Sequence, residues 1–472
     1  MRKGIAIGCG LFLSACQTFS PDGGLSVVAD IAGHELNKDV AALNTTEQEA
    51  SARARVVSLL RRPLTADAAV QVALLNNRGL QAAYNELALA EAAMVQASLP
   101  PNPTFSIERM SGPHEIEIER RIIANILSLA TLPIRADIAA DRFHQAQLRA
   151  AEETLRIAAE TRRAYYRAVA TRQLSGLLTE SKSAAETTSQ LAKRLGETGG
   201  INKLDQAREH VFYAEITGQL ATMRQRASSE RERLVRMMGL WGRDLEFRLP
   251  STLPALPRRV QALPAIETEA VRRRVDLQVA RLELNALAKS YGLTSATRFV
   301  NLLELSGIAK TVKDRETGAR TRDRGFELEF QIPIFDFGEV RVRQAEQTYA
   351  QAVNRLVEKA VNVRSEARDA YRTYRSSYQI AAHYRGEVLP LRRIIADELL
   401  LRYGAMQIDV FALLLEVRQR INANIMAVDA QRDFWLASID LGVAVVGGGM
   451  SGGGGEASRT SVAAGGGGEG GH

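Results

Sequence analysis

A proline-free run sets the strongest limit on how this chain can fold. Between Ile134 and about Leu195 the sequence has no proline and one glycine, Gly176. Because an α-helix rises about 1.5 Å per residue, this run predicts a helix about 90 Å long. The composition agrees, since only 13 of 472 residues are proline and 6% are aromatic, which is typical of long helices.

The sequence also repeats itself. Three segments of the first half recur in the same order in the second, at an offset near 206 residues (366 − 160): 160–173 with 366–379, 191–210 with 399–418, and 64–92 with 263–290. Such self-similarity predicts two copies of one structural unit. The second copy has its own helical run, from about Glu339 to Arg402, which we expect to be kinked at Gly386 and Pro390.

The first residues have the pattern of a secretory signal peptide: a basic start, a short apolar run and small residues before Cys16. Leu13-Ser14-Ala15-Cys16 resembles a bacterial lipobox, in which cleavage precedes a cysteine that is then acylated, for example with palmitate. The alternative is an ordinary signal peptide that happens to contain a cysteine. Cleavage before Cys16 would leave one cysteine, so the product would have no disulfide. Resemblance to bacterial lipoproteins with Gln17 at the next position implies sorting to the outer membrane.

We expect each copy to form a helix, a strand pair, a very long helix, a turn and a further helix. The first helix is predicted to begin near Thr65 and Asp67 and to stop before Pro100, which cannot continue it. The last 26 residues hold 13 glycines and are predicted to be disordered. The chain is thereby divided into a signal peptide (1–15), a lipid-anchored segment (16–62), two structural repeats (63–250 and 251–446) and a glycine-rich tail (447–472).

Two β-hairpins are predicted by alternating apolar and polar residues on either side of turn residues. In the first hairpin, "TFSIER" and "HEIEIER" are joined by residues 110–113. In the second, "TRFVNLLELSGI" and "GFELEFQIPIF" flank a polar segment, Lys310 to Arg324, which we expect to be a loop. The chain therefore has four predicted strands.

The alternation separates an apolar from an acidic face in these strands. One face carries Ile116, Ile118, Phe326, Leu328, Phe330 and Ile332, and the other carries Glu115, Glu117, Glu119, Glu327 and Glu329. This pattern is typical of a transmembrane β-barrel with the apolar residues toward lipid and the acids toward the lumen, although a soluble amphipathic sheet would also show it. Lipid tolerates no open sheet edge, and four strands are too few to close a barrel. Several chains must therefore share one barrel, or the hairpins lie outside the membrane.

The chain resembles the outer-membrane efflux proteins, the TolC-like ducts, from about residue 40 to 445. The matching segments, in the family's order, are "LTADAAVQVALLNNRGLQAA", "LPPNPTFSIE", "GINKLDQAR" and "QIPIFDFGEVRVRQAEQTYAQA". The resemblance implies a mainly α fold with a transmembrane β-barrel. It also implies a homotrimer in the outer membrane, with a 12-stranded barrel and a long periplasmic helical barrel. The expected partners are a periplasmic adaptor and an inner-membrane pump, and the expected function is a passive efflux duct.

Two duplicated turns place a glycine at a helix end and an acid at the next helix start. Glycine as a C-terminal cap and aspartate near an N-terminus explain both turns without any further role. The resemblance implies instead that the turns form the periplasmic tip and that Asp409 belongs to an acidic ring at the closed pore, where Ala412 replaces a second acid. The residues assigned to the tip and gate are Arg194, Gly196, Asp205, Arg402, Tyr403, Gly404 and Asp409.

Other classes of function find little support in the sequence. The formal charge is +7, but basic and acidic residues are mixed along the helices, which favours a solvated surface over a nucleic-acid site. The six histidines are scattered singly and no catalytic constellation is recognisable, so we expect neither an enzyme, a metal site nor a cofactor. A periplasmic coiled-coil scaffolding lipoprotein remains the alternative. The sequence does not distinguish metal ions, drugs and peptides as cargo.

Overall fold

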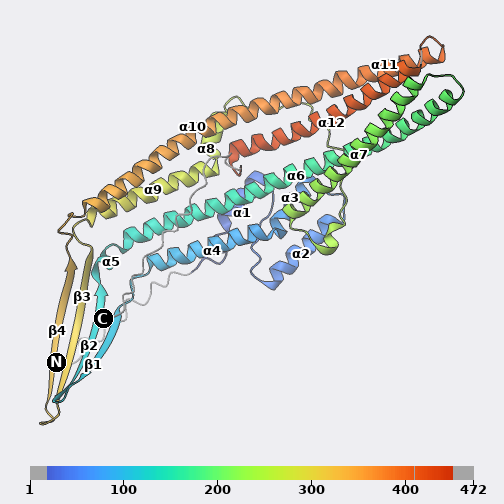
Figure 1. Cartoon of the computed structure of the whole chain (residues 1–472). Coiled ribbons are helices and arrows are strands. Elements are labelled where there is room, and N and C mark those ends of the chain that lie inside the picture. The colour runs from blue at the N-terminus through green and yellow to red at the C-terminus, as the bar shows by residue number, and fades with distance from the viewer. Residues whose placement is uncertain (1–18, 409, 450–472) are drawn as a thin grey trace.

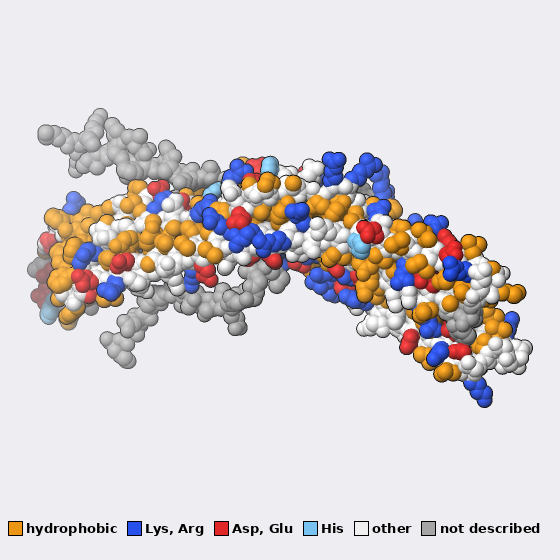
Figure 2. Space-filling model, turned by 90° about the horizontal axis from the view of Figure 1, so that it is seen from above, with side chains coloured by type: hydrophobic (Ala, Val, Ile, Leu, Met, Phe, Trp, Pro, Cys, Tyr) orange, Lys and Arg blue, Asp and Glu red, His pale blue; other side chains and the backbone are white. Residues whose placement is uncertain are grey.

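The computed structural model describes residues 19–408 and 410–449 as a long rod with a small sheet at one end (Figure 1). The predicted signal peptide (1–15), Cys16, Asp409 and residues 450–472 of the predicted tail lie outside the described residues. Helices run from the sheet to a distant tip, which is formed by two turns that each connect a pair of helices (Figure 1). Charged side chains of both signs lie between hydrophobic ones along the rod, as Figure 2 shows.

Both halves of the chain contain two consecutive helices, a strand pair, a long helical run and a further helix in the same order, and the first half has additional short elements. The first half contains α1 (Ser26–Leu36), α2 (Thr46–Leu60), α3 (Ala66–Asn76), α4 (Arg78–Ser98), β1 (Thr104–Ser111), β2 (Glu115–Asn125), α5 (Ile126–Ala130), α6 (Leu132–Glu197), α7 (Lys203–Met238) and η1 (Gly242–Leu245). The second contains α8 (Ile266–Arg273), α9 (Val275–Ala296), β3 (Leu302–Asp314), β4 (Arg320–Gln331), α10 (Glu339–His383), η2 (Tyr384–Val388), α11 (Leu389–Gly404) and α12 (Val410–Val446).

Helix α6 confirms the predicted long helix. It has 66 residues and is therefore about 100 Å long. Pro133 occupies its first turn, where a missing N–H costs no intrahelical hydrogen bond. Its buried positions include many alanines, among them Ala151, Ala158 and Ala168, which allow close approach of the neighbouring helices.

The helix predicted from Thr65 to Leu99 is instead two helices. Thr65 caps α3 by accepting a hydrogen bond from the N–H of Ala68 at 3.1 Å, as its sequence position predicts. Asn77 then breaks the helix in an extended conformation and caps α4. The side chain of Asn77 also donates to the carbonyl of Met237 at 2.9 Å, at the end of α7. Docking of α7 against this junction explains why the helix is interrupted there.

Gly239 allows α7 to end tightly against the α3–α4 junction. Its φ is +65°, and a Cβ at this position would lie 2.8 Å from the carbonyl oxygen of Asn76. Both the backbone conformation and the close approach therefore require glycine. As a result α4 and α7 lie end to end along α6, as Figure 1 shows.

The second long run is also interrupted, as predicted near Gly386 and Pro390. Here η2 is a π-helical turn that contains Gly386, and Pro390 lies in the first turn of α11. A π-helical turn inserts one residue into the helical ladder, and π-turns and prolines are common sites of helix bending. Helices α9 and α12 accompany this run as α4 and α7 accompany α6 (Figure 1).

Two large hydrophobic clusters form most of the core, one mainly in each half, and two smaller clusters lie beside them. The first includes Leu74, Leu80, Val169, Leu234 and Met238, which are all fully buried. The second surrounds Phe434 and joins α8, α10 and α12. Trp435 bridges the clusters, because its ring stacks on Tyr166 with centroids 5.2 Å apart and meets Phe434 edge-on at 5.2 Å.

The four strands form one antiparallel sheet in the order β1-β2-β3-β4. The predicted polar loop from Lys310 to Arg324 is wrong, since β3 continues to Asp314 and β4 begins at Arg320. The strands extend because backbone pairing continues: Lys310 lies opposite Asp323, and Lys313 lies opposite Arg320. Both hairpin turns therefore lie at the end of the sheet farthest from the helices (Figure 1).

Candidate functional site

The strand register separates the sheet into the two predicted faces. Phe326 lies opposite Gly307 and Leu328 lies opposite Leu305, so these side chains share one face with Phe330. Phe326, Leu328 and Phe330 are 83%, 53% and 55% exposed. Ile116 and Ile118 lie on the same face nearer the turns, and Ile332 follows the last residue of β4.

The opposite face carries a network of charged side chains. Glu117 forms an ion pair with Lys310 of the neighbouring strand. Arg121 binds Glu119 at 2.9 Å and reaches Glu327 at 3.1 Å. Glu115 and Glu329 lie on this face as well, and both are exposed. The predicted lumen acids are thus brought together, although two basic residues partly neutralise them.

The sheet has two open edges. Strands β1 and β4 each pair with one neighbour, and every residue of both strands is exposed in the described chain. Their outer backbone N–H and C=O groups therefore have no strand partner within the described residues. An apolar sheet with unpaired edges is unstable in lipid and prone to pair with another strand.

At the tip, the turn between α6 and α7 differs in detail from the prediction. Gly196 lies inside the last turn of α6 and does not cap it; the left-handed residue is Gly199, with φ +75°. The capping residue of α7 is Asn202, whose side-chain oxygen accepts from the N–H of Asp205 at 2.9 Å. Asp205 lies in the first turn of α7 and binds Arg208 at 3.0 Å.

The second turn is similar in outline. Gly404 ends α11 without a left-handed conformation, and Met406 adopts it instead with φ +57°. Arg402 binds Glu398 at 2.9 Å, and Tyr403 is 42% exposed. Asp409, the predicted gate residue, lies outside the described residues. Both turns lie together at the far end of the rod, where Arg194 is also exposed (Figure 1).

A half-buried ion pair joins the two helical hairpins near this tip, and no sequence pattern predicts it. The guanidinium of Arg418 on α12 donates to Glu209 on α7 at 2.8 Å and lies 4.2 Å from the ring centre of Phe212. The Glu209 side chain is only 4% exposed. Beside it, Arg392 of α11 binds Glu416 of α12 at 2.9 Å, and the Glu416 side chain is 5% exposed. These contacts fix α12 against both of its neighbours.

Nearer the sheet, α6, α9 and α10 meet at a cluster of charges. Asp276 binds Arg274 at 2.9 Å and Lys359 at 3.5 Å. Burial raises the pKa of the neighbouring Glu152, and the negative charge of Asp276 raises it further. Burial also opposes ionisation of Glu35 on α1, but hydrogen bonds from Arg273 and His34 outweigh it and lower the Glu35 pKa. The pKa values of the two carboxyl groups are therefore shifted in opposite directions.

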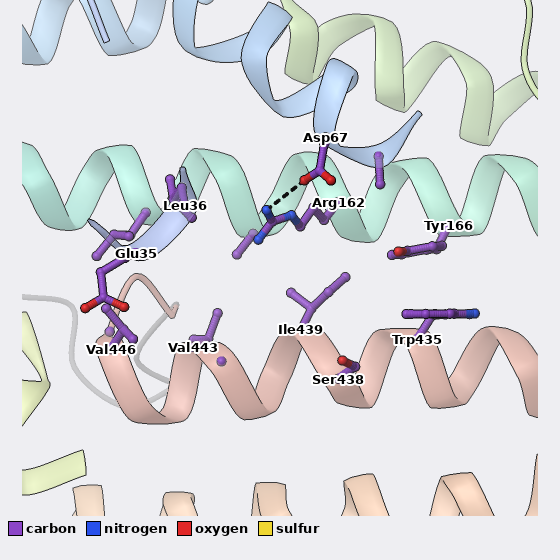
Figure 3. Close-up of a pocket in the computed structure, with 15 residues that line it drawn as sticks. Glu35, Leu36, Asp67, Arg162, Tyr166, Trp435, Ser438, Ile439, Val443 and Val446 are labelled. Carbon is purple, nitrogen blue, oxygen red and sulfur yellow. Dashed lines mark hydrogen bonds and ion pairs between the residues drawn. The ribbon is translucent and has the colours of Figure 1, made fainter. Parts of the chain in front are cut away.

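A hollow of about 310 Å³ lies where the halves meet, between α6 and α12 (Figure 3). Asp67 and Arg162 pair across one side of it at 3.1 Å, and Tyr166 stacks on Trp435 at one end (Figure 3). The ion pair neutralises Asp67 and Arg162, and most of the other lining residues are apolar, with Glu35 and Ser438 as the remaining polar side chains. We interpret the hollow as part of the seam between the halves.

No group of three or more His, Cys, Asp or Glu side chains among residues 19–408 and 410–449 is placed to hold a metal ion. Within the same residues, none of the helices combines the length and the apolar character that crossing a membrane requires.

Comparison with known proteins bears on the fold as a whole. Residues 268–396 match the family model of the outer membrane efflux protein. No curated protein matches the chain. The structure is similar to the CmeC outer membrane channel of Campylobacter jejuni, with a TM-score of 0.69 at 14% identity over 81% of this chain and 85% of that one.

Two further solved structures have a similar fold. A membrane protein from Pseudomonas aeruginosa gives a TM-score of 0.69 at 18% identity, over 83% of this chain and 93% of that one. The MtrE outer membrane channel of Neisseria gonorrhoeae gives 0.65 at 15% identity, over 80% and 88%. The expected resemblance to outer-membrane efflux proteins is confirmed, and the fold is that of the TolC-like channels.

Proposed function

We propose that this chain is the outer-membrane component of a tripartite efflux system, in which three copies form one passive duct. The observation that carries the proposal is the four-stranded sheet with one apolar face and two open edges. Such a sheet cannot sit in lipid alone, because its edge N–H and C=O groups would be neither paired nor hydrated.

Closure by several copies removes both edges. The four strands alternate in direction, so β4 of one copy would run antiparallel to β1 of the next. Three copies would give twelve strands (3 × 4), an even number that suits an all-antiparallel barrel. The apolar face with Phe326 and Leu328 would then contact lipid, and the face with Glu117 and Glu119 would line the lumen.

The helices would extend into the periplasm as a second barrel. Helix α11 has no buried residue within the single chain, and Leu391, Ile394 and Leu401 are 57%, 63% and 70% exposed. Side chains of this kind need a partner surface, and helices of adjacent copies would supply it. The tip turns would then be the docking place of a periplasmic adaptor linked to an inner-membrane pump.

Two elements of the proposal rest on the sequence. We propose that Cys16 is acylated and anchors the mature chain to the outer membrane. Mass spectrometry of the N-terminal peptide tests this, and an unmodified Cys16 would overturn it.

We also propose that Asp409 contributes to an acidic ring at the closed tip, since rings of carboxylates select for cations in channels. Removal of that ring in Asp409→Ala should change cation selectivity, and unchanged selectivity would contradict it.

The closed state would depend on contacts that hold α12 against α7, and the ion pair between Arg418 and Glu209 is such a contact. It links one hairpin to the other near the tip, where α11–α12 would have to separate from α6–α7 for the duct to open. Because the Glu209 carboxylate is buried, separation would expose it and replace its partner with water. An adaptor that binds the separated form would open the duct.

Electrical recording distinguishes a duct from a scaffolding lipoprotein. Purified full-length protein is added to planar lipid bilayers and single-channel current is recorded. A duct predicts discrete conductance steps, whereas a coiled-coil scaffold predicts none. The matched control is Leu328→Arg, which places a charge on the proposed lipid face and should lower the number of inserted channels. Absence of channels in correctly assembled wild-type protein would refute the proposal.

A further inference from the structure

The apolar face of the sheet changes character near the hairpin turns. Six basic side chains lie on this same face in the half that is farther from the helices, and we call them the basic band: Arg109, Arg120, Lys313, Arg320, Arg322 and Arg324.

The strand register shows how sharp the change is. Phe326, Gly307 and Ile122 form one row across the sheet, and this row is apolar. In the next row toward the turns, Arg324 lies opposite Ala309, which lies opposite Arg120. Residues on one face are two positions apart, so apolar gives way to basic within about 7 Å.

The remaining rows toward the turns continue the basic band. Arg322 shares a row with Thr311, Ile118 and Arg109, and Arg320 shares one with Lys313. The segment from Lys310 to Arg324 is polar in sequence, but strand pairing sorts its side chains by charge. Asp323 projects to the face of Glu117 and Glu119, whereas Arg320, Arg322 and Arg324 project to the other.

The basic band is not neutralised from within. All six side chains belong to exposed residues, and none of them forms an ion pair with an acid in the described part of the chain. The nearby acids are used on the opposite face, where Glu117 binds Lys310 and Arg121 binds Glu119 and Glu327. Six like charges on one small surface repel one another and favour an anionic ligand.

The shape of this surface also suits a ligand. A hollow of about 550 Å³ is lined by the basic band together with Lys310, Ile116, Ile118, Ala309, Thr311 and one acid, Asp323. Its apolar residues can contact hydrocarbon, and the guanidinium groups around them can bind phosphate oxygens through paired N–H donors.

We propose that the basic band binds the phosphate groups of lipids in the outer leaflet of the membrane. The inference rests on the proposed function, which puts the apolar rows in hydrocarbon, the helices in the periplasm and the turns outside. Charged side chains are costly against hydrocarbon and much less so at the interface, so the abrupt change marks the level of the lipid head groups. A head group that carries phosphates and stands directly above acyl chains matches the chemistry of the hollow.

The test uses full-length protein in nanodiscs of phosphatidylcholine doped with lipid A, a phosphorylated glycolipid. Lipid that remains bound after transfer to detergent is counted by native mass spectrometry. The variant Arg320→Gln/Arg322→Gln/Arg324→Gln weakens the basic band. The control Arg224→Gln/Arg226→Gln/Arg236→Gln removes equal charge from exposed positions of α7. We expect the first variant to lose about tenfold or more of the bound lipid A and the control to retain it, because basic side chains attract anionic head groups only near the membrane surface.

Three results would overturn the proposal. The first is equal retention of lipid A by wild type and the band variant. The second is equal retention, by wild type, of intact lipid A and of lipid A whose phosphates have been removed. The third is displacement of lipid A by inorganic phosphate. The last would identify a site for a free anion. Channel recording on the same samples separates this test from the proposed function, since the band variant should still conduct. If the triple variant fails to assemble, Arg322→Gln alone is compared with Arg224→Gln.

Discussion

The ion pair near the tip leads to a quantitative prediction about closing of the duct. Arg418→Met keeps most of the apolar stem and removes the guanidinium that binds Glu209 at 2.8 Å. The Glu209 carboxylate would remain buried, since its side chain is 4% exposed. Within the described residues Glu209 forms no other ion pair, so no second cation would replace Arg418.

The cost follows from the burial of the two partners. Loss of one partner from a fully buried pair costs about 3–5 kcal/mol, whereas an exposed pair contributes about 0–1 kcal/mol. The Arg418 side chain is 31% exposed, which places this pair between the two cases. We therefore expect the closed contact to lose about 1–3 kcal/mol per chain. At about 1.4 kcal/mol per factor of ten, this favours the open state by about 5- to 150-fold per chain.

Single-channel recording in planar bilayers measures this shift. Arg418→Met should spend more time in high-conductance states than wild type. Arg420→Met is the matched control, because Arg420 lies on the same helix, is exposed and forms no ion pair in the described part of the chain. If Arg418→Met opens no more often than Arg420→Met, the pair does not hold the tip closed and the reasoning is refuted. If Arg418→Met does not assemble, Glu209→Gln removes the same ion pair and leaves the unpaired charge on Arg418, whose side chain is 31% exposed.

Two further predictions concern the sheet and the charge cluster. Leu328→Arg should lower the yield of assembled protein more than Glu329→Arg, because Arg toward the membrane centre costs about 2–4 kcal/mol; equal yields would contradict the assigned faces. Glu152→Gln should raise the thermal unfolding midpoint at neutral pH, because the raised pKa of Glu152 means that its charged form destabilises the fold. That gain should shrink as the pH falls below the folded pKa toward the usual value of 4.5. Glu35→Gln should lower the thermal unfolding midpoint at neutral pH, because the lowered pKa of Glu35 means that its charged form stabilises the fold. That loss should shrink in acid, where wild-type Glu35 becomes protonated and loses the same stability. Equal pH profiles for the two variants would contradict both assignments.

Much of the architecture could be predicted from local patterns. The absence of proline predicted α6 to within a few residues, because helix propagation depends on residues that lie close in sequence. Alternation predicted the two faces that carry Leu328 and Glu329, since side chains of a strand alternate strictly. The number of strands per chain then implied that several copies must share one barrel if the hairpins lie in a membrane.

The errors arose where distant segments decide the structure. Lys310 to Arg324 lack an apolar face, so their sequence indicated a loop, yet pairing between β3 and β4 continues through most of this segment. The break at Asn77 exists because the end of α7 docks there from 160 residues away. Arg418 and Glu209 are 209 positions apart, and neither is unusual in its local sequence. Contacts of this kind are visible only once the helices are placed.

Native mass spectrometry of the full-length protein decides whether three copies share one barrel. The protein is extracted from membranes in mild detergent, and the mass of the intact assembly is compared with that of a single chain. We expect three chains per assembly, because three sets of four strands close the edges left open by β1 and β4. A stable, membrane-extracted species of one chain would contradict it.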